Sequence, residues 1–409
     1  MHSVPLASDS PVAPSRHGES ALRGLWANGF RPFFLAAALM AVVAVPLWLL
    51  VANGAASVGA GYLQPMAWHA HEMVFGYACA VIAGFLLTAA TNWTGRETAS
   101  GGALRALAGL WLLGRIVLFA GSRLPAPLVA AVDLAFLPAV ALAVGRPIVA
   151  SRSKRSYVML VVLATLFSAN LAVHLDALGL IAGWQLRASR AGVGVVVLLC
   201  AIIAGRVVPM FTRNTTGSAT VVSSKALDVA ALVALAIYTA VDVAAPSSRV
   251  VGGVAAGAAL LVVARAARWG GAASARHPLL WILHLGHAWI AVGLALRAAS
   301  VLGASIPSTA STHAFTVGAV GSLTLGMMAR VSLGHTGRLI AAGPLTVGAF
   351  VLVTLAACAR VFGPVAAGLA VPYLGWLVIS GVAWSVAFAL FLVVYARVLV
   401  APRVDGKPG

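Results

Sequence analysis

Twelve long apolar runs limit what this chain of 409 residues can fold into. A helix needs about 20 apolar residues to cross the hydrocarbon core of a bilayer. Because lipid offers the backbone no hydrogen-bond partner, each run is predicted to form an α-helix. The runs cover about residues 33–52, 70–91, 104–121, 126–146, 156–178, 190–210, 226–244, 250–267, 279–299, 311–331, 344–362 and 374–400. The sequence therefore predicts an all-α polytopic membrane protein with 12 transmembrane helices.

The composition excludes most other classes of protein. Only 9% of the residues are charged and 61% are hydrophobic, whereas a soluble domain carries about 25% charged residues. Residues 1–24 are predicted to be a disordered cytoplasmic tail, 25–401 a single transmembrane domain, and 402–409 a second cytoplasmic tail. No internal repeat is apparent in the sequence, which counts against transporter folds that are built from repeats.

The net charge of +18 indicates how the helices are oriented. Of the 27 Lys and Arg residues, 20 fall in the two tails and the even-numbered connections. Five fall in the odd-numbered connections, and Arg115 and Arg297 fall inside helices. Positive residues accumulate on the cytoplasmic side, so both termini are predicted to be cytoplasmic. The charge thus has a topological explanation and does not call for a nucleic-acid partner.

Histidines are the strongest functional signal, because ionisable residues inside a membrane are costly and usually functional. Imidazole is a common metal ligand, and we expect six histidines from four helices to form a metal site in the outer half of the bundle. They are His69, His71, His174, His284, His287 and His313. His284 and His287 share a helical face and are expected to bind one metal. His69 and His71 are two residues apart, so either they serve two centres or the helix begins after His69.

Acidic residues accompany these histidines toward the outer side. Glu72, Asp133 and Asp176 either form a route for protons or pair with arginine, and both alternatives stay open. The three cysteines lie within apolar runs, and there is no CxxCH motif for covalent haem attachment.

Several separate motifs resemble the NnrS family in order and spacing. They lie at residues 29–34 (GFRPFF), 68–73 (WHAHEM), 92–96 (NWTGR), 205–212 (GRVVPMFT), 283–289 (LHLGHAW) and along 313–338, which ends in GHTGR. The resemblance runs from about residue 25 to residue 400.

The resemblance implies a bacterial inner-membrane protein of the nitric oxide response that contains haem, expected to be b-type, and copper. On this basis the six histidines are the expected metal ligands. Glu72 and Arg330 are the expected catalytic residues. The expected cofactor-binding residues are His69, His71, His174, His313, Arg206 and His335. Arg206, Arg330 and His335 lie near the cytoplasmic boundary, where they would bind haem propionates or a quinol headgroup, or simply reach the interface as helix-end charges.

The leading functional hypothesis is a nitric oxide reductase-like oxidoreductase that binds nitric oxide (NO) and reduces it to nitrous oxide. Such an enzyme needs a quinol or a membrane redox partner as its electron donor. The alternative is a haem and copper protein that senses or sequesters NO without turnover. A third hypothesis is a transporter of a metal or a small solute.

Overall fold

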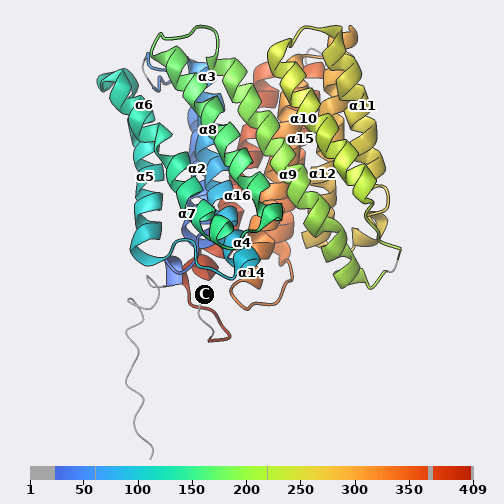
Figure 1. Ribbon diagram of the computed structural model, residues 1–409. Helices are drawn as coiled ribbons and strands as arrows, with labels where there is room; N and C mark the ends of the chain where they lie inside the picture. The colour runs from blue at the N-terminus through green and yellow to red at the C-terminus, as the bar shows by residue number, and fades with distance from the viewer. Residues whose placement is uncertain (1–23, 60, 219, 367–371, 407–409) are drawn as a thin grey trace, which may run out of the picture.

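The computed structural model describes residues 24–59, 61–218, 220–366 and 372–406. All regular secondary structure within these ranges is helical, and 12 helical spans are long and apolar enough to cross a membrane. The spans stand side by side as a bundle (Figure 1). The prediction of an all-α protein with 12 transmembrane helices is confirmed.

Nine spans contain one α-helix each and three are composite. The nine are α2 (Phe30–Ala52), α5 (Gly101–Ala120), α8 (Tyr157–Ala177), α9 (Gln185–Thr216), α10 (Lys225–Ala244), α11 (Arg249–Ala266), α12 (Pro278–Leu302), α15 (Pro344–Ala366) and α16 (Tyr373–Val400). The composite spans are α3 (Pro65–His71), η1 (Glu72–Ala78) and α4 (Cys79–Thr94); α6 (Ala126–Leu134) and α7 (Phe136–Ala150); and α13 (Ser308–His313), η5 (Ala314–Gly321) and α14 (Ser322–Gly334). Short 3-10 turns lie at η2 (Gly121–Arg123), η3 (Lys154–Ser156) and η4 (Ala272–Ser274).

The first and last helices are joined at one end of the bundle. The Arg31 guanidinium at the start of α2 donates hydrogen bonds to the carbonyls of Leu399, at 2.8 Å, and Ala401, at 2.6 Å. We call this end the C-terminal face (marked C in Figure 1) and the other end the opposite face. Both ends of the helical domain thus lie on one face, and its cytoplasmic location stays a prediction. The predicted N-terminal tail lies outside the described residues except for Gly24.

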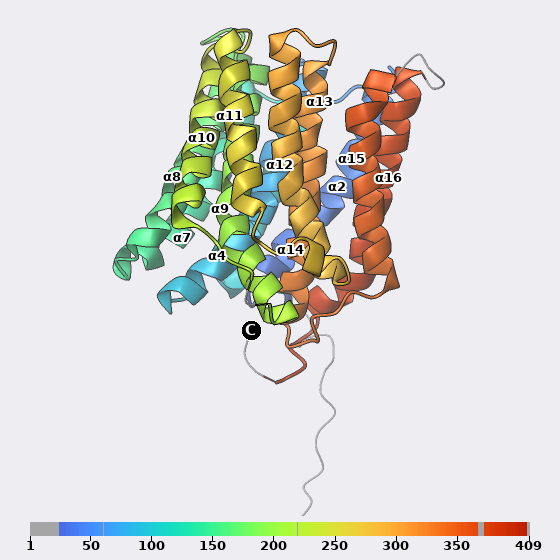
Figure 2. The ribbon, with the colours of Figure 1, turned by 90° about the vertical axis from the view of Figure 1, so that its right-hand side faces the viewer.

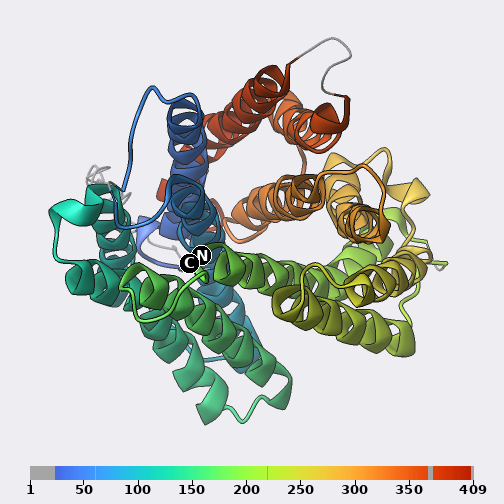
Figure 3. The same ribbon diagram turned by 90° about the horizontal axis from the view of Figure 1, so that it is seen from above.

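Two composite spans occupy the centre of the bundle. Of their most apolar windows, 89% is buried for Pro65–Thr94 and 72% for Ser308–Gly334, more than for any other span of the described chain. The remaining helices surround them, with α16 packed between α2 and α15 on one side and α10 beside α11 on another (Figures 2 and 3). Residues on these two central spans are therefore the best placed for chemistry inside the bundle.

The two central spans are also repeats of each other, so the expectation of no internal repeat is wrong. Each has a short α-helix that ends at a histidine, then a π-helical segment, then a second α-helix. The identical residues, each pair 242 positions apart, are Pro65 and Pro307, His71 and His313, Gly76 and Gly318, Gly84 and Gly326, Thr94 and Thr336, Gly95 and Gly337, and Arg96 and Arg338. Because π-helical segments occur frequently at functional sites, the repeat directs attention to His71 and His313.

Candidate functional site

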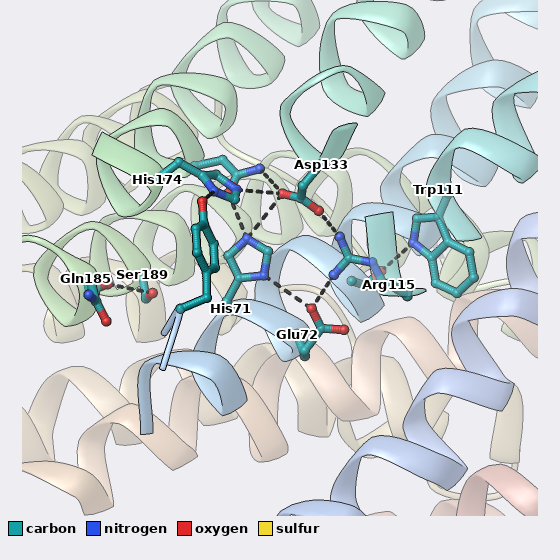
Figure 4. A network of polar contacts seen from close by, with 11 residues as sticks. His71, Glu72, Trp111, Arg115, Asp133, His174, Gln185 and Ser189 are labelled. Carbon is teal, nitrogen blue, oxygen red and sulfur yellow. Dashed lines mark hydrogen bonds and ion pairs between the residues drawn. The ribbon is translucent and has the colours of Figure 1, made fainter. Parts of the chain in front are cut away.

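Helix α3 and the π-helical segment η1 present different residues to two separate sites. Because α3 begins at Pro65, His69 and His71 both belong to the helix and point to different sides. His69 and Tyr77 line a cavity. His71 and Glu72 contact a polar network on the other side (Figure 4). The helix therefore does not begin after His69, and the two rings face different surroundings.

We call the polar network the ionic cluster; it comprises Tyr62, His71, Glu72, Arg115, Asp133, Asn170 and His174. Asp133 of α6 is its centre. The Oδ2 atom of Asp133 lies 3.0 Å from Nε2 of His174 and 3.3 Å from Nε2 of His71. The same oxygen accepts a hydrogen bond from Asn170 Nδ2 at 2.8 Å. Ligand atoms of His71, Asp133 and His174 all lie within 4.8 Å of one another. The structure therefore brings two of the predicted histidines together with a carboxylate.

Arg115 of α5 completes the ionic cluster by bridging its two carboxylates. Its Nη1 donates to Glu72 Oε1 at 2.6 Å, and its Nη2 donates to Asp133 Oδ1. On the other side of the cluster, the Tyr62 hydroxyl lies 2.6 Å from Nδ1 of His174. Burial, followed by the negative charge of Asp133, raises the pKa of Tyr62. The Tyr62 hydroxyl therefore keeps its proton, and it can donate to an unprotonated Nδ1 of His174 or accept a hydrogen bond from Nδ1–H.

The charge balance of the ionic cluster leaves room for one more cation. Ionised Glu72 and Asp133 carry two negative charges against the single positive charge of Arg115, and all three side chains are at most 10% exposed. An uncompensated charge in such a place is expensive. A proton on an imidazole, or a metal ion between His71, Asp133 and His174, removes the imbalance. Imidazole nitrogen suits copper, so this donor set fits a copper ion.

The second site is a cavity of about 240 Å³ accessible to water-sized molecules, which we call the histidine cavity. Residues from α2, α3, η1, α9, α13, η5, α15 and α16 form its walls, which are mainly apolar. Its large aromatic residues are Trp48, Tyr77 and Trp384, and its imidazoles are His69 and His313. One buried arginine, Arg360, also lines it. Such mostly apolar concave sites are typical of cofactor binding.

Both imidazoles of the histidine cavity have an available nitrogen. His313 Nδ1 lies 2.7 Å from the Thr309 carbonyl, which can only accept a hydrogen bond, so the proton is on Nδ1 and the lone pair on Nε2. Metal-bound histidines are commonly held in this way. The His69 ring stacks on Trp48 at 4.5 Å, and its Nδ1 has no hydrogen-bond partner within the described part of the chain. The apolar walls and the free Nε2 of His313 fit a haem with an axial imidazole.

The expectation that six histidines gather in one half is wrong for His284 and His287. Helix α12 begins at the C-terminal face, and at 1.5 Å per residue His284 lies only about 9 Å along it. His284 Nε2 lies 2.9 Å from the hydroxyl of Thr212, close to the end of α9. His287 packs on Trp269 at 4.6 Å, and its ring lies near the backbone of Val262. These two histidines form a separate pair.

Arg206, Arg330 and His335 also lie toward the C-terminal face, away from both sites. The Arg330 guanidinium lies 3.9 Å from the ring centroid of Phe211, and Arg206 is exposed. Burial, followed by the positive charge of Arg403, lowers the pKa of His335. The structure therefore does not bring Arg330 together with Glu72, the other predicted catalytic residue.

A comparison with protein families agrees with the motifs in the sequence. A family model described as NnrS protein matches residues 24–403, nearly the whole chain. The chain belongs to the NnrS family. This family binds metals and is associated with the response to nitric oxide, so the chain is a multi-pass membrane protein related to that response. No curated protein was found to match the sequence.

Sequence reasoning left several residues of this NnrS-family protein outside the expected ligand set. Asp133 was considered only as a proton carrier or an arginine partner, and the structure confirms the pairing with Arg115 for Asp133 and Glu72. Asp176 instead accepts hydrogen bonds from the backbone of Trp184 and the side chain of Gln185. A usable signal existed for Arg115, because an arginine in the middle of a span requires a partner.

Proposed function

We propose that this NnrS-family protein is a haem and copper protein of the bacterial inner membrane that binds nitric oxide and reduces it to nitrous oxide. One observation carries the proposal. Two sites lie on two sides of the same helix, α3 with η1: a His–Asp–His cluster that lacks one positive charge, and a histidine-lined cavity. The cavity would bind the two NO molecules that are joined, and the cluster on the other side of the helix would pass electrons and protons to it.

Copper is assigned in this proposal to His71, Asp133 and His174. A copper ion there would supply one-electron redox chemistry and a place for a small ligand. Arg115, through its ion pairs with Glu72 and Asp133, would balance part of the negative charge beside the copper. With Nε2 of His174 turned toward the copper, its Nδ1–H would donate to the hydroxyl oxygen of Tyr62, in the way that outer hydrogen bonds orient metal-bound imidazoles.

Haem is assigned to the histidine cavity, where His313 would hold it through Nε2 and His69 would contribute to the same wall. A haem held in this way would supply a binding position for a gas molecule. The mainly apolar walls would pack against the haem ring. Because NO is small and uncharged, it can reach such a site from the bilayer.

The reaction consumes two NO, two electrons and two protons and yields one nitrous oxide and one water. A quinol supplies both the electrons and the protons, and it is the donor that we propose. Glu72 lies 3.3 Å from His71 Nδ1 and 2.6 Å from Arg115. We assign to its carboxylate the transfer of protons to the ionic cluster, which is its role as the candidate catalytic residue.

The test is to purify the protein, record its optical spectrum, measure its metal content, and follow nitrous oxide production from NO with a reduced quinol. We expect haem, copper and turnover. Spectral NO binding without nitrous oxide would replace the enzyme by the sensing or sequestering alternative. Absence of both haem and copper would refute the proposal as a whole.

A further inference from the structure

Arg360 differs from the other arginines buried inside the bundle. The others have identified counter-groups in the chain: Arg115 has Glu72 and Asp133, Arg265 has Asp228, Arg297 has Asp242, and Arg31 has the carbonyls of Leu399 and Ala401. Arg360 is 8% exposed, and its Nη2 donates only to the Tyr373 hydroxyl, at 3.3 Å. Its Nη1 has no partner in the described ranges.

The surrounding chain contains no carboxylate that could neutralise Arg360. No Asp or Glu occurs between Asp242 and Asp405, a stretch that includes α13, η5, α15 and α16. Asp242 is paired with Arg297, and Asp405 with Arg403. A buried guanidinium without a counter-charge is costly, so the position is explained best by an anion from outside the chain.

The internal repeat independently indicates that Arg360 lacks a carboxylate partner in the chain. Arg115 follows His71 by 44 residues and lies on the next span, and Arg360 follows His313 by 47 residues and also lies on the next span. In the first copy, the residue after the histidine is Glu72, which binds Arg115. In the second copy, that residue is Ala314. The arginine is retained while the carboxylate beside the histidine is absent.

We propose that Arg360 binds the carboxylate of the molecule that occupies the histidine cavity. The cavity thereby selects a largely apolar ligand that carries an acidic group at one edge. The identity of that ligand rests on the proposed function: it is haem, whose propionates are carboxylates. A guanidinium forms its strongest hydrogen bonds with a carboxylate, and Tyr373 holds the guanidinium from the other side. Arg360 would therefore hold the acidic edge of the ligand against its part of the cavity wall.

The experiment compares haem with its dimethyl ester, which keeps the ring and the iron but lacks both carboxylates. Haem-depleted full-length protein is titrated with each compound, and binding is followed by absorption and by quenching of tryptophan fluorescence. We expect the unaltered protein to bind haem at least about tenfold more tightly than the ester. Arg360→Gln should bind both compounds with similar affinity, and Arg360→Lys should recover part of the preference. Arg190→Gln is the matched control, because Arg190 lines the same cavity but is exposed.

Each outcome separates this inference from the proposed function. Equal binding of haem and ester by the unaltered protein would overturn the role of Arg360 and leave the haem assignment intact, whether or not the variants fold. A preference that persists in Arg360→Gln would overturn it as well. Binding of a long-chain fatty acid, abolished in Arg360→Gln, with no binding of either haem compound would support the carboxylate site and refute haem as its ligand.

Discussion

The ionic cluster and the histidine cavity share one helix and resolve the cost of buried polar groups in opposite ways. In the cluster, nearly every charged atom has a partner from the chain, and only one unit of positive charge is needed for balance. In the cavity, the guanidinium of Arg360 and the nitrogens of two imidazoles have few partners or none in the described chain. This contrast supports the proposal that the cluster binds a small ion and that the cavity binds a larger ligand with its own carboxylates.

The largest expected effect is a loss of thermal stability when the ionic cluster is disrupted. Replacing Asp133 by Ala leaves Arg115 half paired and removes the common partner of His71 and His174. Breaking a buried pair from one side costs about 3–5 kcal/mol, so we expect a large loss of thermal stability or of folded protein. Thermal unfolding monitored by size-exclusion chromatography measures it. Asp176→Ala, which alters a carboxylate that bonds a connecting loop, serves as the control and should be milder.

Replacing either of the two repeat histidines, His71 or His313, should remove one cofactor and leave the other bound. His313→Gly should abolish the haem spectrum while copper is retained, and added imidazole should restore the spectrum because the cavity keeps its apolar walls. His71→Gln should lose copper and retain haem. Optical spectra and metal analysis of both variants decide the matter. Loss of both cofactors in each folded variant would mean that the two sites are not independent.

The two equivalent arginines should respond differently to the same substitution. Arg115→Met leaves two uncompensated carboxylates and should destabilise the protein by several kcal/mol. Arg360→Met removes a charge that has no carboxylate partner in the described chain, so haem-depleted protein should be as stable as before or more stable. Melting temperatures of the two haem-depleted variants provide the measurement. Equal destabilisation would contradict the contrast between cluster and cavity.

A smaller effect is expected from Tyr62, which contacts His174 at the edge of the ionic cluster. Tyr62→Phe removes the hydroxyl that contacts His174 Nδ1 but preserves the ring. Loss of such an outer hydrogen bond typically weakens metal binding by 10–100-fold, and we expect about tenfold for copper with no change in haem binding. Competition with a copper chelator measures this. Unchanged copper affinity would exclude Tyr62 as an orienting residue.

The smallest effect should come from the C-terminal face. His284→Ala removes a hydrogen bond with Thr212 and lies away from both sites. We expect a cost of about 1 kcal/mol with haem and copper both retained. Loss of either cofactor in this variant would show that the His284 and His287 pair is a ligand site after all.

The fold could be read from the sequence because apolar runs of membrane length leave the backbone few alternatives. The partition of His69 and His71 between two sites was one of two open alternatives, since it depends on where the helix begins. The prediction for the depth of His284 is wrong, although its place a few residues into a helix that starts at the C-terminal face implies a shallow position. The role of Arg360 needed the structure, because it depends on which side chains from distant spans surround the guanidinium.

Because both sites share one helix, ligand binding at one site is electrostatically coupled to ligand binding at the other. The helix that lies between them is about 10 Å wide, and both sites include buried residues of α3 and η1. Occupation of the cluster by a cation therefore changes the electrostatic potential in the cavity. By thermodynamic linkage, the occupant of the cavity must alter the affinity of the cluster by the same factor. The loading of either site is thus a measurable function of the loading of the other.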